Sequence, residues 1–149
     1  MDNASDVELT FERDYRFKVD FRLPAAPLIV ADATPPLGEG AGPDSEKLLV
    51  AAVANCLSAS LLFSLNKFKN GPVPMRTVGK ARLVRNEQGR LRVGGIEVEI
   101  ALGVPASELR LLDRALAQFE DFCVVTQIVK AAIPVTVRVI DGAGALLAG

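Results

Sequence analysis

The sequence predicts an α+β fold, on three observations. Its 149 residues match the commonest size of a single domain. Stretches with alternating apolar and polar residues predict strands, and one long run of apolar and small residues predicts a helix. The expected order, β-β-β-α-β-β-α-α-β, has no regular βαβ alternation, and such a mixture is typical of the α+β class. We therefore expect a single domain over residues 1–149.

Three strands are expected before the first helix. VELTFERDYRFKVDFRL, residues 7–23, repeats apolar side chains with a period of two and predicts two antiparallel strands that meet near residues 13–15. PLIVADATP, residues 27–35, predicts a third, short strand between prolines. The loop that follows, residues 33–45, is dense in proline and glycine, and its length suggests more than a simple connection.

A long central helix is expected to begin after Asp44 and Ser45, which suit the N-cap position, and to end near Phe68. All faces of its middle, LLVAAVANCLSASLL at residues 48–62, are apolar or small, as in a helix covered on every side. A chain of this size does not easily surround such a helix, so we expect a second subunit to help cover it. Its serines, its asparagine and the flanking charges favour a buried helix over a membrane span.

The second half is expected to contain a strand pair at residues 75–102 and two helices at 104–122 and 123–132. A closing strand at 133–140 and a loose tail at 141–149 follow. The strand pair turns at residues 86–89, and Gly94–Gly95 predicts a bulge or bend. Ser107 is the expected cap of the first of the two helices, whose leucines and phenylalanine recur at helical spacing.

Composition narrows the possible functions. Seventeen basic and eighteen acidic residues leave a net charge of −1, which argues against nucleic acid as a partner and against a polybasic membrane anchor. The N-terminus lacks the basic start and apolar core of a signal peptide. The chain has no histidine and only two cysteines, without the spacing of a zinc site. We expect a soluble cytoplasmic protein without metal or cofactor.

The two cysteines allow two interpretations. A free cysteine is among the most buried residue types and packs as a small hydrophobe, and a stable disulfide is not expected in a reducing compartment. Cys56 lies in the middle of the apolar helix, and Cys123 falls at an expected helix start. Free N–H groups there would lower the pKa of the Cys123 thiol, while Glu120 and Asp121 would oppose that effect.

Two motifs resemble the OsmC/Ohr family of thiol-dependent peroxidases. GPDSEKLLVAAVANCLSASL, residues 42–61, is similar to the family's central-helix motif, in which a glycine-rich loop leads into an Ala-rich helix with a reactive cysteine. FCVVTQIVKAAIPVTVRV, residues 122–139, resembles the C-terminal signature, in which a second cysteine opens a short helix before a final strand. The resemblance extends over most of the chain, to about Val139.

The resemblance implies an intertwined homodimer in which antiparallel sheets pack around a long buried central helix. Cys56 would attack the distal oxygen of an organic hydroperoxide and become a sulfenic acid. Cys123 would then condense with it to form a Cys56–Cys123 disulfide. An external dithiol, a lipoylated protein in the Ohr branch, would reduce that disulfide, and the protein would serve in defence against oxidative stress.

The family also implies an arginine from the N-terminal strands that supports the reactive thiolate, and a glutamate that holds this arginine. Arg13 is the expected arginine, with Arg16 and Arg22 as alternatives, and Glu46 matches the glutamate. Ten residues of helix span about 15 Å, so Glu46 and Cys56 cannot touch along one helix. Either the arginine bridges them or the partner's Glu46 takes part, which fits a site at the dimer interface.

Some features differ from the family pattern, and other functions stay open. Val124 stands where many members have proline, and Asn55 stands where alanine is common. The Asn55 side chain would either form a hydrogen bond near the sulfur or fill a buried polar position at a contact between helices. An apolar pocket would suit organic or fatty-acid hydroperoxides, and its expected lining is Leu49, Val53, Phe63, Phe119 and Phe122. The alternatives are an OsmC-fold dimer that binds a small apolar or thiol-reactive ligand without efficient turnover, and a structural dimer with packed cysteines.

Overall fold

The computed structural model describes residues 5–149. They form two compact units, one ending at Leu48 and one from Leu49 to Gly149, and each unit is described by itself. The α+β class is confirmed. The elements follow the expected order, to which the structure adds two short 3-10 helices and a seventh strand. The single domain expected over residues 1–149 stays a prediction.

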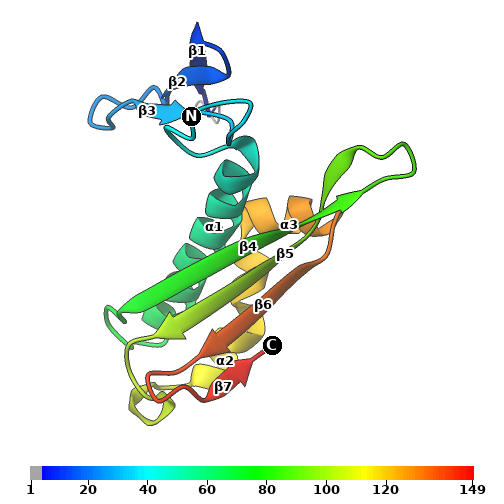
Figure 1. Ribbon diagram of the computed structural model, residues 1–149. Helices are drawn as coiled ribbons and strands as arrows, with labels where there is room; N and C mark the ends of the chain where they lie inside the picture. The colour runs from blue at the N-terminus through cyan, green and yellow to red at the C-terminus, as the bar shows by residue number, and fades with distance from the viewer. Residues whose placement is uncertain (1–4) are drawn as a thin grey trace. The chain divides into compact units, whose positions relative to one another are not determined.

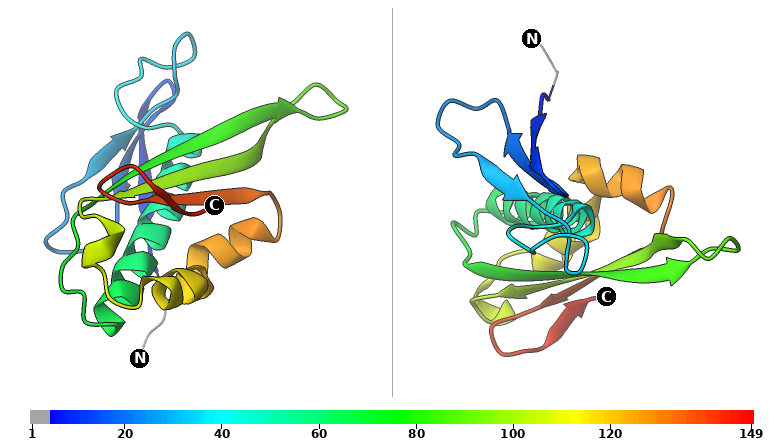
Figure 2. Two further views of the ribbon diagram at one scale, coloured as in Figure 1. Left: turned by 90° about the horizontal axis from the view of Figure 1, so that it is seen from below. Right: turned by 45° about the horizontal axis from the view of Figure 1, so that its top comes forward.

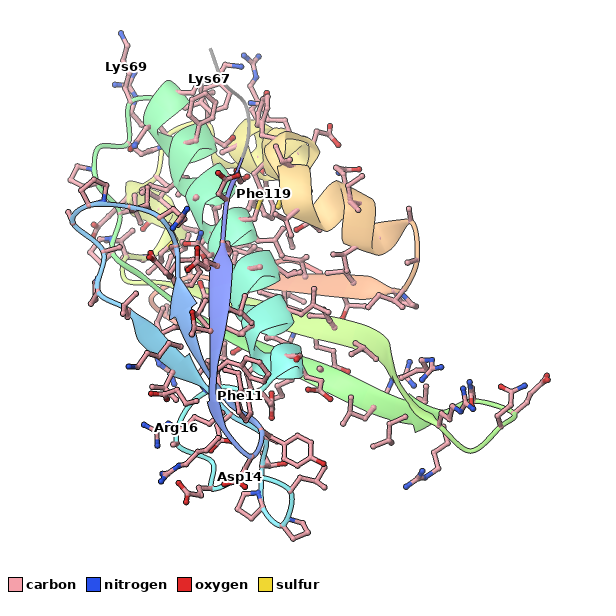
Figure 3. The ribbon with its side chains drawn as sticks, turned by 90° about the horizontal axis from the view of Figure 1, so that it is seen from above. Phe11, Asp14, Arg16, Lys67, Lys69 and Phe119 are labelled. Atoms are coloured by element: carbon pink, nitrogen blue, oxygen red, sulfur yellow. The ribbon has the colours of Figure 1, made fainter. Side chains whose placement is uncertain are left out.

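The N-terminal unit holds an antiparallel sheet of three strands in the order β1-β2-β3. Their bounds are Glu8–Arg13, Arg16–Asp20 and Ile29–Ala31. The expected hairpin between the first two strands is present, and Figure 3 labels Asp14 and Arg16 at its turn. Phe11 pairs with Phe17 across the two strands, and their rings meet edge to face with centroids 5.8 Å apart.

Asp32 organises the loop between β3 and the central helix. Its buried carboxylate accepts hydrogen bonds from the backbone N–H groups of Glu39 and Ala41, both at 3.1 Å. These bonds, led by the one from Ala41, lower the pKa of Asp32. Gly42 passes so close to β3 that a Cβ atom there would lie 1.8 Å from the Val30 carbonyl oxygen. The Gly-rich composition of the loop therefore reflects close backbone packing.

The central helix α1 spans Ser45–Lys67. The predicted cap is confirmed, since Asp44 Oδ1 accepts the N–H of Lys47 at 2.8 Å. After the helix the backbone turns through left-handed conformations at Lys69 (φ 61°) and Gly71 (φ 67°). Among residues 5–149, α1 is the one helix long and apolar enough to cross a bilayer, but one side of it contributes to the core of the second unit.

The second unit contains a four-stranded sheet in the order β4-β5-β6-β7 (Figure 1), with bounds Met75–Arg85, Leu91–Leu102, Val135–Ile140 and Leu146–Ala148. The β4–β5 pair is antiparallel, and its register shifts opposite Gly94 as expected. The β5–β6 pair is parallel, so the expectation of antiparallel sheets is wrong for this pair. The long helical crossover between β5 and β6 returns the chain to the end of the sheet at which β5 begins, so β6 can run in the same direction as β5. The tail, expected to be loose, forms β7 against β6.

The crossover consists of η1 (Ala106–Glu108), α2 (Leu112–Gln118), η2 (Phe119–Phe122) and α3 (Val124–Lys130). The single helix expected over residues 104–122, with Ser107 as its cap, is therefore wrong. Ser107 lies inside η1, and Leu111 interrupts the helix with a left-handed backbone at φ 49°. Figures 1 and 2 show α1, α2 and α3 on one face of the four-stranded sheet.

The core of the second unit lies between α1 and this sheet. Every fourth residue of α1 points into this core, and alternate residues of β5 pack against these side chains. The buried residues of α1 are Val53, Leu57, Leu61 and Leu65, and those of β5 are Ile96, Val98, Ile100 and Leu102. This spacing places one stripe of α1 in the core, whereas Ala52, Asn55, Ala59 and Phe63 on another face are exposed among the described residues. This exposed side is the uncovered face of α1, and it carries Cys56 at its edge.

Candidate active site

Cys56 lies at the edge of the uncovered face of α1. Its side chain is partly buried, between the core stripe and the exposed Ala52, Asn55 and Ala59. These small residues leave space above the helix, so the thiol is accessible from one side. The composition of the helix thus has two functions, since its large apolar residues fill the core while its small ones expose the sulfur.

Cys123 occupies the N-cap position of α3 and is fully buried. Its sulfur lies 2.7 Å from the hydroxyl oxygen of Thr126, with which it is hydrogen-bonded. The Cys123 thiol also lowers the pKa of Cys56, and Cys56 in turn raises the pKa of Cys123. The structure therefore brings together the two cysteines, which are 67 positions apart in the sequence and both free.

The first turn of α3 points its backbone N–H groups at the sulfur of Cys56. Burial raises the pKa of the Cys56 thiol, but the hydrogen bond from Cys123 and those from the N–H groups of Val125, Thr126 and Val124 lower it, and the net pKa is lowered. A lowered pKa increases the fraction of thiolate, which is the nucleophilic form of cysteine.

Cys123 has the opposite shift. Burial raises the pKa of its thiol, and the neighbouring Cys56 raises it further, while Thr126 lowers it in part. The sequence placed the favourable helix N–H groups at Cys123, whereas the structure directs them to Cys56. An N-cap side chain can accept bonds from these N–H groups, but Cys123 makes no side-chain cap bond, so a side chain from another element can receive them.

An open groove of about 600 Å³ runs beside Cys56. Its lining is mainly apolar and comes from α1, η2 and α3, with Ala52, Asn55, Cys56, Ala59, Ser60, Phe63, Phe122 and Val125. Of the expected pocket residues, Phe63 and Phe122 line this groove. Val53 and Phe119 are instead buried in the core, and Leu49 packs against it; Figure 3 labels Phe119 next to α1. Asn55 is exposed and lines the groove, and both roles expected for it stay predictions.

Two aromatic rings line the groove, and one cation lies beside them. Phe63 and Phe122 meet edge to face with ring centroids 5.5 Å apart. The Lys67 ammonium lies 5.8 Å from the centroid of Phe122, at the end of α1 seen in Figure 3. Within residues 5–149 Lys67 forms no ion pair with a carboxylate, and its polar neighbour is the Gln118 amide oxygen at 3.5 Å. The groove thus joins a thiol to an apolar surface, and a cation lies next to one of its lining rings.

The predicted arginines all lie in the N-terminal unit and are ion-paired there. Arg13 pairs with Glu39 at 2.9 Å, Arg16 with Glu12 at 2.9 Å and Arg22 with Glu8 at 3.0 Å. Among the described residues up to Leu48, no ion pair joins one of these arginines to Glu46, which lies in the first turn of α1. Their roles at Cys56 stay predictions.

Glu39 and Thr126 are not among the residues that the motifs predicted for the site. Glu39 is the carboxylate that lies 2.9 Å from Arg13 and 3.9 Å from Arg16; its place within a glycine-rich loop gave no signal. Thr126 could have been found, because a hydroxyl three residues after a helix N-cap lies close to the cap residue. Within residues 5–149, no group of three His, Cys, Asp or Glu side chains could hold a metal ion.

Comparison with known proteins identifies the class. The model of the OsmC-like protein family matches residues 38–138, more than half of the chain. The chain therefore belongs to the OsmC-like family. No curated protein sequence matches it.

Solved structures show the same fold. An OsmC-like protein of unknown function from Vibrio cholerae has a TM-score of 0.74 at 18% identity, covering 93% of this chain and 99% of that one. The organic hydroperoxide resistance protein OhrB of Bacillus subtilis has a TM-score of 0.66 at 16% identity, covering 91% and 97%. An organic hydroperoxide resistance protein OsmC from Legionella pneumophila, also described as a predicted redox protein, has a TM-score of 0.66 at 15% identity, covering 93% and 98%.

Proposed function

We propose that this protein is a thiol-dependent peroxidase that reduces organic hydroperoxides in defence against oxidative stress. The observation that carries the proposal is the contact between Cys56 and Cys123, in which one thiol has a lowered pKa and faces an open apolar groove. Family membership supports it, because two structural neighbours are named as organic hydroperoxide resistance proteins.

The first step is nucleophilic attack by the Cys56 thiolate on the distal oxygen of the hydroperoxide. The S–O bond forms as the O–O bond breaks, which leaves Cys56 as a sulfenic acid and releases an alkoxide that takes up a proton to become the alcohol. The N–H groups of α3 stabilise the thiolate before the attack, and Cys56 is oxidised while the peroxide is reduced.

The second step joins the two sulfurs. Cys123 attacks the sulfur of the Cys56 sulfenic acid, the S–S bond forms, and the S–O bond breaks to release hydroxide, which leaves as water with the thiol proton. An external dithiol then reduces the disulfide by thiol–disulfide exchange and is itself oxidised. A lipoylated protein is the dithiol that the family resemblance implies.

The groove indicates the substrate class. Its apolar middle favours a hydroperoxide with a hydrocarbon body over hydrogen peroxide. Lys67, beside the lining residue Phe122, adds attraction for an anionic group, so a fatty-acid hydroperoxide would place its chain in the groove and its carboxylate near Lys67. Eleven residues separate Cys56 from Lys67 along α1, or about 16 Å, a distance that a long acyl chain can span.

A homodimer would cover the exposed apolar face around the site. Phe63, Val124 and Ile128 expose 58%, 78% and 75% of their surface within one chain. Single exposed apolar residues are normal on a protein surface, but a group of them on one surface indicates an interaction site. Within such a dimer Arg13 is proposed as the arginine that supports Cys56, and Glu46 as the glutamate that holds it. Light scattering after size exclusion tests the dimer, and a monomer at micromolar concentration would contradict it.

Steady-state turnover tests the function. The protein is given cumene hydroperoxide and dihydrolipoamide, and peroxide loss is followed. We expect Cys56→Ser to abolish turnover, whereas Cys123→Ser keeps the first step and loses the disulfide. Glu108→Gln, on an exposed 3-10 helix of the same unit, is the control that leaves turnover unchanged. Equal rates for wild type and Cys56→Ser would contradict the proposal.

A further inference from the structure

The proposed cycle makes two different demands on Cys123. Before the peroxide reacts, its thiol donates a hydrogen bond that favours the Cys56 thiolate. Afterwards its sulfur must be the nucleophile that attacks Cys56. Cys123 is fully buried, and burial raises the pKa of its thiol. A group that stabilises the Cys123 sulfur as it loses its proton is therefore required for the second step.

Thr126 is placed to meet this demand. Its side chain is fully buried, and its hydroxyl oxygen lies 2.7 Å from the sulfur of Cys123. Within residues 5–149 this is the one hydrogen bond that its hydroxyl makes. A hydroxyl both donates and accepts and rotates to suit its partner. When the single proton of the Cys123 thiol points at the Cys56 thiolate, the Thr126 hydroxyl can therefore donate to the Cys123 sulfur, and it can keep donating once that sulfur is a thiolate.

The backbone of Thr126 serves the other cysteine. Its N–H is among those that hydrogen-bond to the sulfur of Cys56. The same N–H also lowers the pKa of Cys123, so the backbone of Thr126 acts on both thiols while its side chain bonds the Cys123 sulfur. This is useful experimentally, because replacing the side chain leaves the backbone N–H in place.

We propose that Thr126 is a positioning residue for disulfide formation, and that its hydroxyl holds the Cys123 sulfur toward Cys56 and donates to that sulfur as it becomes a thiolate. The inference rests on the proposed function and deepens its second step. In that step the S–S bond forms, the S–O bond of Cys56 breaks, and hydroxide leaves with the Cys123 proton as water. The threonine keeps its own proton throughout, so the balance of the reaction is unchanged.

A purely structural role predicts different behaviour. A hydroxyl that only stabilises the first turn of α3 would, when removed, also displace the N–H groups that face Cys56. Both steps would then slow together. A role at the Cys123 sulfur slows the second step alone.

The two steps are separated by rapid mixing of the reduced protein with one equivalent of cumene hydroperoxide. Sulfenic acid is trapped with dimedone, and the disulfide is followed by loss of free thiols. We expect Thr126→Val, which has nearly the same shape, to form sulfenic acid within about twofold of wild type and to close the disulfide about tenfold more slowly, the effect of one hydrogen bond to a charged group. Thr126→Ser should restore the rate of closure.

Several outcomes overturn the inference. Disulfide closure at the wild-type rate in Thr126→Val would do so, as would an equal slowing of both steps or a failure of Thr126→Ser to restore closure. Thr126→Ala removes the same hydroxyl and replaces the valine variant if that variant does not fold. Absence of sulfenic acid in the wild type has a separate meaning, because it overturns the proposed function itself.

Discussion

Cys56 and Cys123 shift each other's pKa in opposite directions, because the Cys123 thiol lowers the pKa of Cys56 while Cys56 raises that of Cys123. The first turn of α3 adds to the difference, since three of its N–H groups lower the pKa of Cys56, whereas one lowers that of Cys123 and burial raises it. The pair is therefore ordered before any oxidant arrives, with Cys56 as the nucleophile and Cys123 as the donor. Equivalent packed cysteines would show no such asymmetry.

Thiol alkylation measures this asymmetry. Because the pKa of Cys56 is lowered, its reaction with iodoacetamide should reach half its maximal rate at a lower pH than an ordinary thiol. Cys123→Ala removes one hydrogen bond to the thiolate, so it should raise the midpoint and slow alkylation at pH 7 severalfold. Mass spectrometry assigns the modified residue. An unchanged midpoint in Cys123→Ala would contradict the coupling.

Lys67 should act on the binding of anionic substrates. Its ammonium lies over Phe122, which lines the groove, so Lys67→Met is expected to lower kcat/KM for a fatty-acid hydroperoxide about fivefold, the upper range for an exposed ion pair. Cumene hydroperoxide, which has no carboxylate, should be reduced at an unchanged rate. Lys69→Met, just beyond the end of the same helix, is the matched control. Equal losses with both peroxides would contradict a charge-specific role.

The sequence predicted local features more reliably than distant contacts. The period of two in residues 7–23, the Asp44 cap and the bulge at Gly94 depend on near neighbours, and all three are confirmed. The break at Leu111 is different, because it accompanies hydrogen bonds between Asn70 and the backbone of Arg110 across 40 residues. Such a contact overrides the helical spacing of the local leucines.

The same distinction applies to the site. Each cysteine was found from its motif, since the surrounding pattern is local. Which thiol receives the N–H groups of α3 depends on the packing of α1 against that helix, and no local pattern carries this information. The parallel β5–β6 pairing and the added β7 likewise depend on where the crossover and the tail return to the sheet.

Ser64 should contribute measurably to stability. Its buried hydroxyl donates to the Ala115 carbonyl at 2.9 Å and so links α1 to α2. Ser64→Ala leaves that carbonyl buried without this partner, which should lower the free energy of unfolding by about 1.5 kcal/mol and the Tm by about 5 °C. Ser107→Ala, at an exposed position without a side-chain cap bond, is the control. Equal Tm values for the two variants would contradict the expectation.

Asp141 should make stability depend on pH in the acid range. Hydrogen bonds from the backbone N–H groups of Ala106, Ala145 and Ala143 lower its pKa below the value in the unfolded chain. Its contribution is therefore present above the unfolded pKa of about 3.9 and is lost as the pH falls through the lower folded pKa.

Asp141→Asn should be less stable than wild type at pH 7, because its amide nitrogen cannot accept one of these N–H bonds. Its stability should also fall less steeply than that of the wild type below about pH 4. Urea unfolding at a series of pH values compares the two proteins. Parallel curves for wild type and variant would show that Asp141 does not carry this pH dependence.

The most direct test of the central claim is the intact mass and free-thiol count of the reduced protein, before and after one equivalent of cumene hydroperoxide. We predict loss of both thiols, a mass decrease of about 2 Da and a peptide that links Cys56 to Cys123. Two thiols that stay free and unmodified would contradict a peroxidase, and would leave an OsmC-like protein whose cysteines serve binding or packing.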